Sequence, residues 1–459
     1  MRSVRCRMWV AAMIGGLALV LVAPATPAAA MDAPVVVKLV PENGATEVDP
    51  DTAEIRVTFD REMSAGSHSF CGGGPLFPKF RGRPKWVNRR TVVVKVRLEP
   101  EHDYQLGLNC PAAQNFRAAD GQPLAPVLWT FSTASRRSKA AQRALNRDSL
   151  KELMETLKDE YAYYDRKEID WHKREKKYHK RIVGSKNTRA WVKHVATLLA
   201  PAEDLHLWLE FGGKSMATFR RNVRPNIDLD GVKAILPGLK QENRTVWSAR
   251  TPDGIGYLLI ASWGKDREGD LEGVATILDR FGDTVGLIID VRANAGGDEL
   301  LARQVAAWFI DGEKVYARNV YRNAASKTGF GKVLSRSIKG NAPPRRYDRP
   351  VRVLMGRACM SSCEAFLLMM KQGRNVKLLG ERSFGSSGNP KPHELANRVT
   401  VYIPSWKALR PDGTTFEGEG IKPDIEVKAS AGSLKKGDPV IRRALKDLGA
   451  KTRKKKRKR

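Results

Sequence analysis

The chain has 459 residues, enough for two or three domains, and its apolar fraction of 42% is typical of a globular protein. Its formal net charge is +31, from 81 Lys and Arg against 50 Asp and Glu. Such a charge suits contact with polyanions, but no nucleic-acid-binding module is visible, so we do not expect a specific nucleic-acid partner. The absence of a Cys-x-x-Cys pair and of a His-Glu-x-x-His stretch argues against a metal site. We expect no cofactor.

The N-terminus resembles a secretory signal. Three arginines among the first seven residues precede an apolar run from Met8 to Val22, and small residues at 27–30 offer a cleavage site. The run is short for a membrane span, and no later run is long enough to be one. We therefore expect residues 1–30 to be a signal peptide and the mature protein to be exported, periplasmic or extracellular, without a transmembrane segment.

The C-terminal residues 446–459 carry a dense positive charge. Eight of the nine residues from Lys451 to Arg459 are basic. Such a tail is usually a solvated, disordered end, and it could also bind an anionic surface or polymer. Both roles stay open on the sequence.

Residues 34–135 carry a β pattern. Short alternating or apolar stretches predict strands at Glu54–Phe59, Thr91–Val96, Tyr104–Leu108 and Val127–Thr133. Two cysteines of this region, Cys71 and Cys110, could form a disulfide in an oxidising compartment. The region resembles a bacterial immunoglobulin-like module in its opening stretch, KLVPENGATEVDPDTAEIRVTFDREM, and its closing one, LAPVLWTFST. The resemblance implies a β-sandwich that serves as a spacer or binding module.

The remaining chain changes from a helical to a mixed pattern. Residues 136–215 are expected to be a helical segment, with helices over 141–164 and Arg189–Leu199. From 216 to 445, strand patterns alternate with helix patterns. Apolar strands are expected at Ile255–Ile260, Gly286–Ile289, Val351–Met355 and Val376–Leu379, and a helix at Glu299–Phe309. Strand and helix in alternation predict a largely parallel sheet covered by helices.

Ser361 stands between a predicted strand and an apolar helix pattern at Ala365–Met370. A serine on a tight strand-to-helix turn exposes its hydroxyl at the positive end of a helix, where backbone N–H groups can stabilise an oxyanion. The residues Ser361 to Glu364, Ser-Ser-Cys-Glu, also fit a helix capping box. The G-x-S-x-G signature of a nucleophile elbow is absent, so this motif alone favours capping.

Four collinear blocks between about 145 and 445 resemble the serine peptidases that include the C-terminal (tail-specific) processing peptidases and the tricorn core. The blocks are Asp159–Tyr178, Glu203–Phe211, Gly286–Ala302 and the stretch from Ser361 to Val427. The resemblance implies a crotonase-like or ClpP-like α/β core and peptide-bond hydrolysis with Ser361 as the nucleophile. The expected fold is thus multidomain: an Ig-like β-sandwich, a helical segment and an α/β peptidase core.

The family uses two kinds of general base. One branch has a lysine in a TFGKG block, but this chain has SFGSSG there, with Ser386 at the lysine position. The other, tricorn-like branch uses the histidine of a DGHT block, and His206 matches that histidine. Leu205 and Leu207 replace the flanking glycine and threonine. The resemblance implies His206 as the base, while a structural role is the alternative for any single histidine.

The resemblance implies further roles in the same site. Glu417 aligns best with the orienting carboxylate, and Glu419 is the alternative. Gly296 and the amide of Ser362 are the expected oxyanion donors, with Ser386 as a possible support. On its own residues, the Asn-Ala-Gly-Gly stretch that contains Gly296 fits a tight strand-to-helix turn equally well.

The sequence therefore predicts an exported serine peptidase that acts on peptide or protein substrates. No PDZ-like block stands between Phe211 and Trp247, which argues against strict recognition of substrate C-termini. Two alternatives stay open: a catalytically inactive binding protein on the same fold, and a surface protein that binds polyanions.

Overall fold

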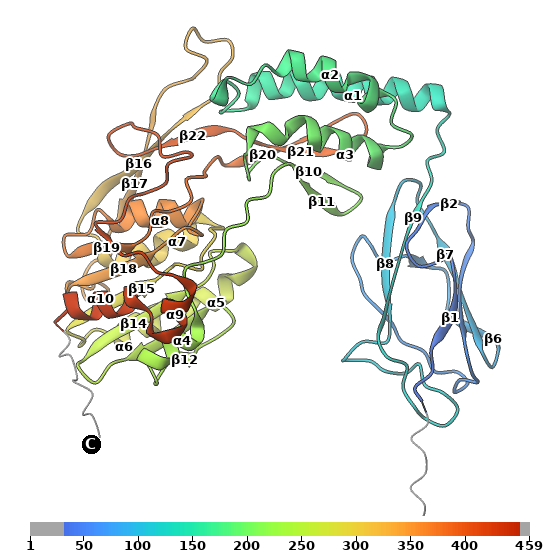
Figure 1. Cartoon of the computed structure of the whole chain (residues 1–459), viewed down its shortest axis with the longest axis horizontal. Helices are drawn as coiled ribbons and strands as arrows, with labels where there is room; N and C mark the ends of the chain where they lie inside the picture. The colour runs from blue at the N-terminus through green and yellow to red at the C-terminus, as the bar shows by residue number, and fades with distance from the viewer. Residues whose placement is uncertain (1–31, 450–459) are drawn as a thin grey trace, which may run out of the picture. The chain divides into compact units, whose positions relative to one another are not determined.

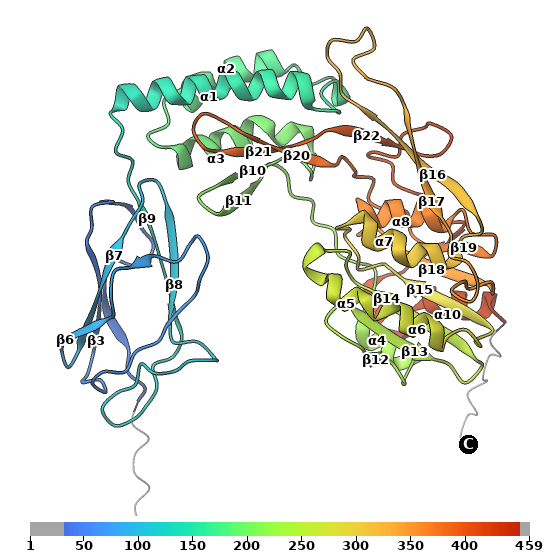
Figure 2. The same cartoon turned by 180° about the vertical axis from the view of Figure 1, so that it is seen from behind.

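A computed structural model describes residues 32–449, which form two compact units, one mainly N-terminal and one that contains the chain from Ser132 onward. Figures 1 and 2 show the chain from opposite sides. The predicted signal peptide and all but the first four residues of the predicted tail lie outside the described residues. Within residues 32–449, no helix is both long and apolar enough to cross a membrane.

The N-terminal domain consists of two β-sheets, as expected for a β-sandwich. The first sheet contains β1 (Val36–Val40), β3 (Glu54–Phe59), β7 (Thr91–Arg97), β5 (Lys79–Phe80) and β6 (Lys85–Asn88). The second contains β2 (Ala45–Val48), β9 (Val127–Thr133), β8 (Asp103–Leu108) and β4 (Phe70–Cys71). Inward-facing aromatic residues, among them Phe59, Phe116 and Trp129, are fully buried. A disulfide joins Cys71 to Cys110.

Three helices and a four-stranded sheet follow. The helices are α1 (Lys139–Glu160), α2 (Trp171–Val183) and α3 (Thr188–Leu199), with short 3-10 turns η1 (Arg166–Glu168) and η2 (Ala200–Ala202). The sheet has the order β11 (Lys214–Ala217), β10 (Trp208–Phe211), β21 (Thr400–Pro404) and β20 (Pro390–Glu394). Figure 1 shows the helices along one side of this sheet, and buried apolar residues from both form one cluster.

The predicted helical segment over 136–215 also contains the strand β10 and the start of β11. The helix α2 lies between the two helices that were given bounds; its sequence is mostly charged, and only Trp171 and Ile182 are buried in it. The strand β10 lies inside the predicted helical segment and pairs with β21, almost two hundred residues later in the chain. Residues 206–217 and 390–404 therefore belong to one layer, and the loop before β10 reaches the loop that contains Ser386.

The core sheet has seven strands in the order β12 (Lys240–Gln241), β13 (Val246–Arg250), β14 (Ile255–Ile260), β15 (Gly286–Asp290), β18 (Val351–Met355), β19 (Val376–Gly380) and β23 (Ile425–Glu426). The five strands from β14 to β23 are parallel, as the alternating pattern predicted. A separate three-stranded sheet contains β17 (Leu334–Lys339), β16 (Glu313–Tyr321) and β22 (Trp406–Leu409).

Helices cover both faces of the core sheet (Figure 1). One face packs against α6 (Val274–Arg280), α7 (Glu299–Ala306) with η4 (Ala307–Phe309), and α8 (Ser362–Met370), with η3 (Lys265–Arg267) and α5 (Glu268–Glu272) leading into α6. The other packs against α4 (Leu229–Ile235) and α10 (Pro439–Asp447), and α9 (Ala431–Gly437) lies beside α4. Successive residues of β14 alternate between the two faces: Leu258 lies in one cluster and Leu259 in the other.

A buried ion cluster joins the end of β15 to the start of α10. Arg292 contacts Asp290 at 2.6 Å and Asp438 at 2.8 Å, and all three side chains are fully buried. Asp438 also accepts bonds from the first backbone amides of α10. Removing one member would leave an unpaired buried charge, so the cluster fixes the chain just before the Gly296 turn.

Candidate active site

The predicted site residues meet at the carboxyl ends of three parallel strands. The turn with Gly296 follows β15, the turn with Ser361 follows β18, and the loop with Ser386 follows β19. The carboxyl edge of a parallel sheet is where such folds place ligands and catalytic groups. His206 reaches the same place from the loop before β10, and Glu417 from the segment between β22 and β23.

Ser361 has the backbone of a strained turn. Its φ is 55° and its ψ is −126°, a conformation that non-glycine residues rarely adopt. It precedes the first residue of α8, yet its side chain makes no capping hydrogen bond. The serine half of the predicted capping box is therefore absent, although the Ser361 backbone N–H does act on the Glu364 carboxylate. The half-buried hydroxyl is unused by the fold, and the strain, of order 1–3 kcal/mol for such conformations, points to a functional turn.

Gly296 lies directly against this turn. A Cβ at Gly296, whose φ is +99°, would come within 2.7 Å of the carbonyl oxygen of Met360, 3.0 Å of the Ser361 Cβ and 3.1 Å of the Ser362 nitrogen. Contacts this short do not occur for real Cβ atoms against backbone, so glycine is required. The close approach explains why the strand-end turn carries paired glycines.

The backbone donors differ from the predicted pair at one position. The N–H of Gly296 donates to Oδ1 of Asn294 at 2.9 Å, so it is already occupied. The N–H groups of Ser362 and Gly297 have no acceptor among residues 32–449. The Ser362 hydroxyl donates to the Gly297 carbonyl at 2.5 Å, which holds the two segments together. Among residues 32–449, the free amides are thus that of Ser362, next to Ser361, and that of Gly297, whose carbonyl accepts the Ser362 hydroxyl.

His206 is buried and held on two sides. Its Nδ1 lies 3.0 Å from Oγ of Ser386, and its backbone N–H donates to Oδ1 of Asp204 at 2.8 Å. The same Asp204 oxygen is 3.9 Å from Nδ1, and Tyr161 donates to the other oxygen at 3.0 Å. Burial lowers the pKa of His206 below its ordinary value of 6.5, and the charge of Asp204 opposes that shift. Among the described residues, no hydrogen bond joins His206 to Ser361.

Glu417 lies beside this group and does not contact the imidazole. Its carboxylate accepts the Ser387 N–H at 2.8 Å and pairs with Arg166 at 3.2 Å. Burial raises the pKa of Glu417 well above its ordinary value and the nearby Asp204 carboxylate raises it further, while Arg166 opposes the shift. Glu417 therefore supports the Ser386–Ser387 loop, and Asp204 is the carboxylate nearest to His206.

The alternative carboxylate, Glu419, lies at the surface. Its side chain is 63% exposed and pairs with Arg410 at 3.3 Å. Glu419 thus lies in a different environment from Glu417, which is buried.

Glu364 is the main site residue that sequence reasoning missed. Its carboxylate is completely buried and accepts hydrogen bonds from the Ser383 hydroxyl and from the N–H groups of Gly385 and Ser386. Burial raises its pKa to about 7. One signal was present in the sequence: Glu364 is the single charged residue of the otherwise apolar α8. A charged residue in the first turn of an apolar helix is seldom buried without specific partners.

The two cysteines that flank Ser361 are free thiols. Cys359 and Cys363 are both buried, and Cys359 donates to the carbonyl of Val291 at 3.1 Å. Burial raises the pKa of the Cys363 thiol well above its ordinary value, which leaves it protonated and unreactive. Of these three side chains, only that of Ser361 is partly exposed.

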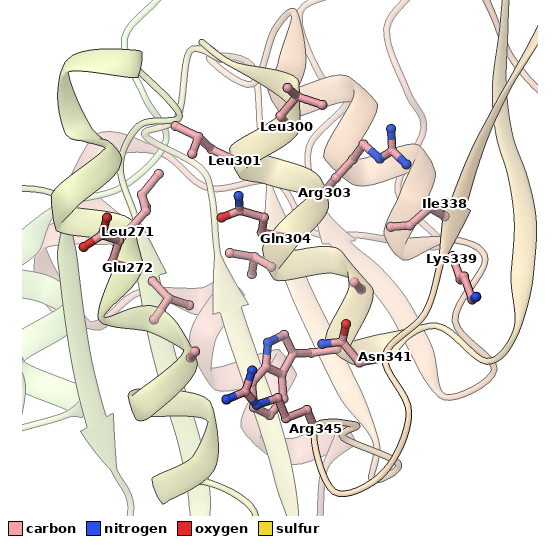
Figure 3. A pocket seen from close by; sticks show the side chains of 15 residues that line it. Leu271, Glu272, Leu300, Leu301, Arg303, Gln304, Ile338, Lys339, Asn341 and Arg345 are labelled. Carbon is pink, nitrogen blue, oxygen red and sulfur yellow. The ribbon is translucent and has the colours of Figure 1, made fainter.

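Two grooves of the core lie away from this cluster. One of about 650 Å³ runs between α5, α6 and α7 and is lined by residues that include Leu271, Leu300 and Arg345 (Figure 3). Its lining contains no member of the serine–histidine cluster. Within residues 32–449, no group of three or more His, Cys, Asp and Glu side chains is placed to hold a metal ion.

The cluster combines the elements of nucleophilic acyl transfer: a half-exposed serine on a strained turn, free amides beside it and a buried histidine with a bonded Nδ1. The family model for peptidase family S41 matches residues 254–427, and the model for a bacterial Ig-like domain matches residues 30–133.

Relatives with known sequences match part of the chain. It is 27% identical over 203 residues to carboxy-terminal processing protease CtpA of Bacillus subtilis, which covers 44% of this chain and 40% of that protein. It is 24% identical over 190 residues to CtpB of the same organism, covering 40% and 37%. The chain thus spans less than half the length of these curated relatives.

A solved structure, described as that of a candidate peptidase from Parabacteroides merdae, resembles the fold. It covers 66% of this chain and 97% of its own, with a TM-score of 0.57 and 23% sequence identity. The order of the matched blocks, the core sheet and the family model agree. The chain therefore carries a peptidase family S41 domain, preceded in the sequence by a bacterial Ig-like domain.

Proposed function

We propose that this protein is an exported serine peptidase that hydrolyses peptide bonds through an acyl-enzyme on Ser361. The observation that carries the proposal is the turn at Ser361: a strained backbone, a hydroxyl that the fold does not use, and the unpartnered Ser362 amide next to it. A turn that only started a helix would use the serine as a cap. Export rests on the N-terminal sequence, and the Ig-like domain is consistent with it.

The proposed base is Nε2 of His206. When Nδ1 carries the proton and donates it to Ser386 Oγ, the other ring nitrogen has a free lone pair. Burial lowers the pKa of His206, so the imidazole is neutral and able to accept a proton at pH 7. Since no hydrogen bond joins His206 to Ser361 without substrate, we expect the two to approach when a peptide binds.

The chemistry then follows in two halves. Nε2 takes the proton of Ser361 while Oγ bonds to the peptide carbonyl carbon, and the carbonyl electron pair moves to oxygen. The C–N bond breaks as His206 returns the proton to the leaving amine. Water, deprotonated by the same nitrogen, attacks the ester and releases the carboxylic acid and Ser361.

The amides of Ser362 and Gly297 are the proposed oxyanion donors. Both lack an acceptor among the described residues, whereas the Gly296 amide is held by Asn294. Gly296 keeps a necessary role, because only a residue without a side chain allows these two segments to meet. Asp204 is the proposed partner of the imidazolium, since its carboxylate is 3.9 Å from Nδ1. Glu417 acts on the Ser387 backbone instead.

The proposed substrates are peptides or proteins without strict selection of their C-termini. Between β11 and β13 the chain contains only α4 and the short β12, with no further domain to hold a substrate tail. The names of the curated relatives describe carboxy-terminal processing in those proteins. Comparing hydrolysis of one peptide with a free or an amidated C-terminus would test this part, and equal rates are expected.

One observation favours a second candidate, a catalytically inactive peptide-binding protein on the same fold. His206 contacts Ser386 and not Ser361, so the serine has no bonded base. In that case a peptide would bind at the same edge of the sheet without turnover. Labelling by an active-site probe separates the two candidates.

The test uses a fluorophosphonate serine probe on the purified chain without residues 1–30. Wild type should be labelled, and both Ser361→Ala and His206→Ala should lose labelling. His393→Ala is the matched control, because His393 is a half-buried histidine of β20 outside the cluster. Loss only in Ser361→Ala would reject the histidine base. No labelling of a folded wild type would reject the peptidase and favour the binding protein.

A further inference from the structure

The carboxylate of Glu364 connects the nucleophile helix to a separate loop. Glu364 lies one helical turn after Ser361 on α8. It accepts hydrogen bonds from the Ser383 hydroxyl at 2.5 Å, the Gly385 N–H at 2.7 Å and the Ser386 N–H at 3.0 Å. One buried side chain therefore holds three of the four residues from Ser383 to Ser386 in the loop that follows β19.

The same loop contacts both the proposed nucleophile, Ser361, and the proposed base, His206. The Ser386 carbonyl accepts the N–H of Ser361 at 2.8 Å, and the Ser386 hydroxyl bonds Nδ1 of His206 at 3.0 Å. Ser386 thus lies between the two catalytic candidates, and its backbone N–H is held by Glu364. Protonation or replacement of the Glu364 carboxylate would therefore alter its hydrogen bond to Ser386, and through Ser386 the hydrogen bond to His206.

The loop has little freedom apart from this anchor. Ser383 Oγ accepts the Ile421 N–H at 2.6 Å, and the Gly385 carbonyl accepts the Gly418 N–H at 2.7 Å. A Cβ at Gly385 would lie 2.5 Å from the Gly420 nitrogen. The loop therefore packs tightly on the segment that carries Glu417, and Glu364 sits beneath the junction.

We propose that Glu364, as a carboxylate, is a positioning residue that fixes the Ser383–Ser386 loop so that Ser386 presents its hydroxyl to His206 and its carbonyl to the Ser361 amide. This inference rests on the proposed function, since it assigns the residue to the same reaction. A carboxylate suits the task because its two oxygens accept all three donors. An amide would turn an N–H₂ group towards at least one N–H donor.

The proposed positioning role depends on the charge state of Glu364. No ion pair involves Glu364 among residues 32–449. Three titratable or polar neighbours act on it: the carboxyl of Glu417 and the hydroxyl of Ser383 from the facing loops, and the thiol of Cys363 on its own helix. Burial raises the pKa of Glu364 to about 7, whereas burial lowers that of His206 below 6.5. The pKa values of the two groups are therefore shifted in opposite directions.

The test measures the rate of fluorophosphonate labelling against pH for wild type and Glu364→Gln. At about pH 8 we expect labelling of the variant to be about 10- to 100-fold slower, the scale of a small misplacement of catalytic groups. Wild type should lose rate as pH falls through about 7, where Glu364 takes up a proton. The pH profile of the variant should lack this fall in rate and should keep only the fall at lower pH that belongs to His206. Glu381→Gln, a change of the same kind just before the loop, should behave as wild type.

A second readout does not depend on activity. The ¹⁵N NMR signal of His206 Nδ1 should report the bond to Ser386 and should change in Glu364→Gln as it does in Ser386→Ala. If wild type is not labelled, the proposed function fails while this signal still tests the positioning. If Glu364→Gln does not fold, Ser383→Ala removes one donor and should slow labelling several-fold. An unchanged pH profile together with an unchanged His206 signal in Glu364→Gln would overturn the inference.

Discussion

The stability of the core should depend on pH through Glu364. Its pKa in the fold is about 7 against an ordinary value of 4.5, because burial penalises the charged form. A carboxyl with a raised pKa binds its proton more tightly in the folded state. The contribution to stability is therefore complete below about pH 4.5 and is lost as pH rises through about 7. This is the reverse of the usual acid that is stabilised as a carboxylate.

The magnitude follows from the shift. A difference of one pKa unit corresponds to about 1.4 kcal/mol, so a group that moves from 4.5 to about 7 changes the free energy of unfolding by about 3 kcal/mol in total. Glutamine at 364 has no charge at any pH and removes this dependence. Loss of its hydrogen bonds adds an offset that does not vary with pH. We therefore compare the free energies of unfolding of the two proteins. The measured quantity is how much their difference changes between about pH 5 and pH 8.

Urea unfolding of wild type and Glu364→Gln, followed by tryptophan fluorescence at several pH values, measures that difference. The Ig-like domain unfolds as a separate unit but is identical in both proteins, so its contribution cancels. We expect glutamine to gain about 2–3 kcal/mol relative to wild type as pH rises across this range. A difference that stays constant with pH would refute the charge assignment of Glu364. If the expected gain is observed, the wild-type residue combines lower stability with faster chemistry at pH 8.

Three further changes test other parts of the structure. Gly296→Ala places a Cβ 2.7 Å from the Met360 carbonyl at a φ of +99°. The free energy of unfolding of the core should fall by about 1–3 kcal/mol, and probe labelling should fall sharply. Unchanged labelling in a folded variant would disprove the close approach. Cys71→Ser breaks the disulfide with Cys110, which closes a loop of 39 residues, and thermal unfolding should show the Ig-like domain weakened by about 2–4 kcal/mol with the core transition unchanged. Arg166→Gln removes the cation paired with the buried glutamate of the site, and we expect slower peptide hydrolysis with a larger effect on kcat than on KM; an effect on KM alone would place Arg166 in substrate binding.

The fold was predictable where a local pattern matched its surroundings. Continuous apolar stretches such as Ile255–Ile260 and Val351–Met355 are strands buried on both faces, and the structure confirms them. The helix α2 was not predictable from periodicity, because thirteen mostly charged residues bury only Trp171 and Ile182. The pairing of β10 with β21 was also hidden, since each strand is short and its partner is far away in the sequence.

The candidate site also has residues that the sequence could indicate and residues that it could not. Ser361 and His206 could be found because they stand in recognisable motifs at fixed spacing, and the structure brings both to the edge where Ser386 lies. Glu364 was missed because its contacts with the 383–386 loop lie about twenty residues away in the sequence, whereas Asp204 stands only two residues before His206 and its contact could have been considered. The choice between neighbouring glycines at 296 and 297 depends on which amide is already bonded, which only the folded backbone determines.

The most direct test of the central claim is peptide mapping of the wild-type protein after reaction with the fluorophosphonate probe. The account predicts one probe per chain, attached to Ser361, which is half-buried and free of hydrogen bonds through its side chain. Attachment to Ser386, which is only 2% exposed but contacts His206, would contradict the assignment of the nucleophile. A folded protein without any adduct would contradict the proposal that this chain is a serine peptidase.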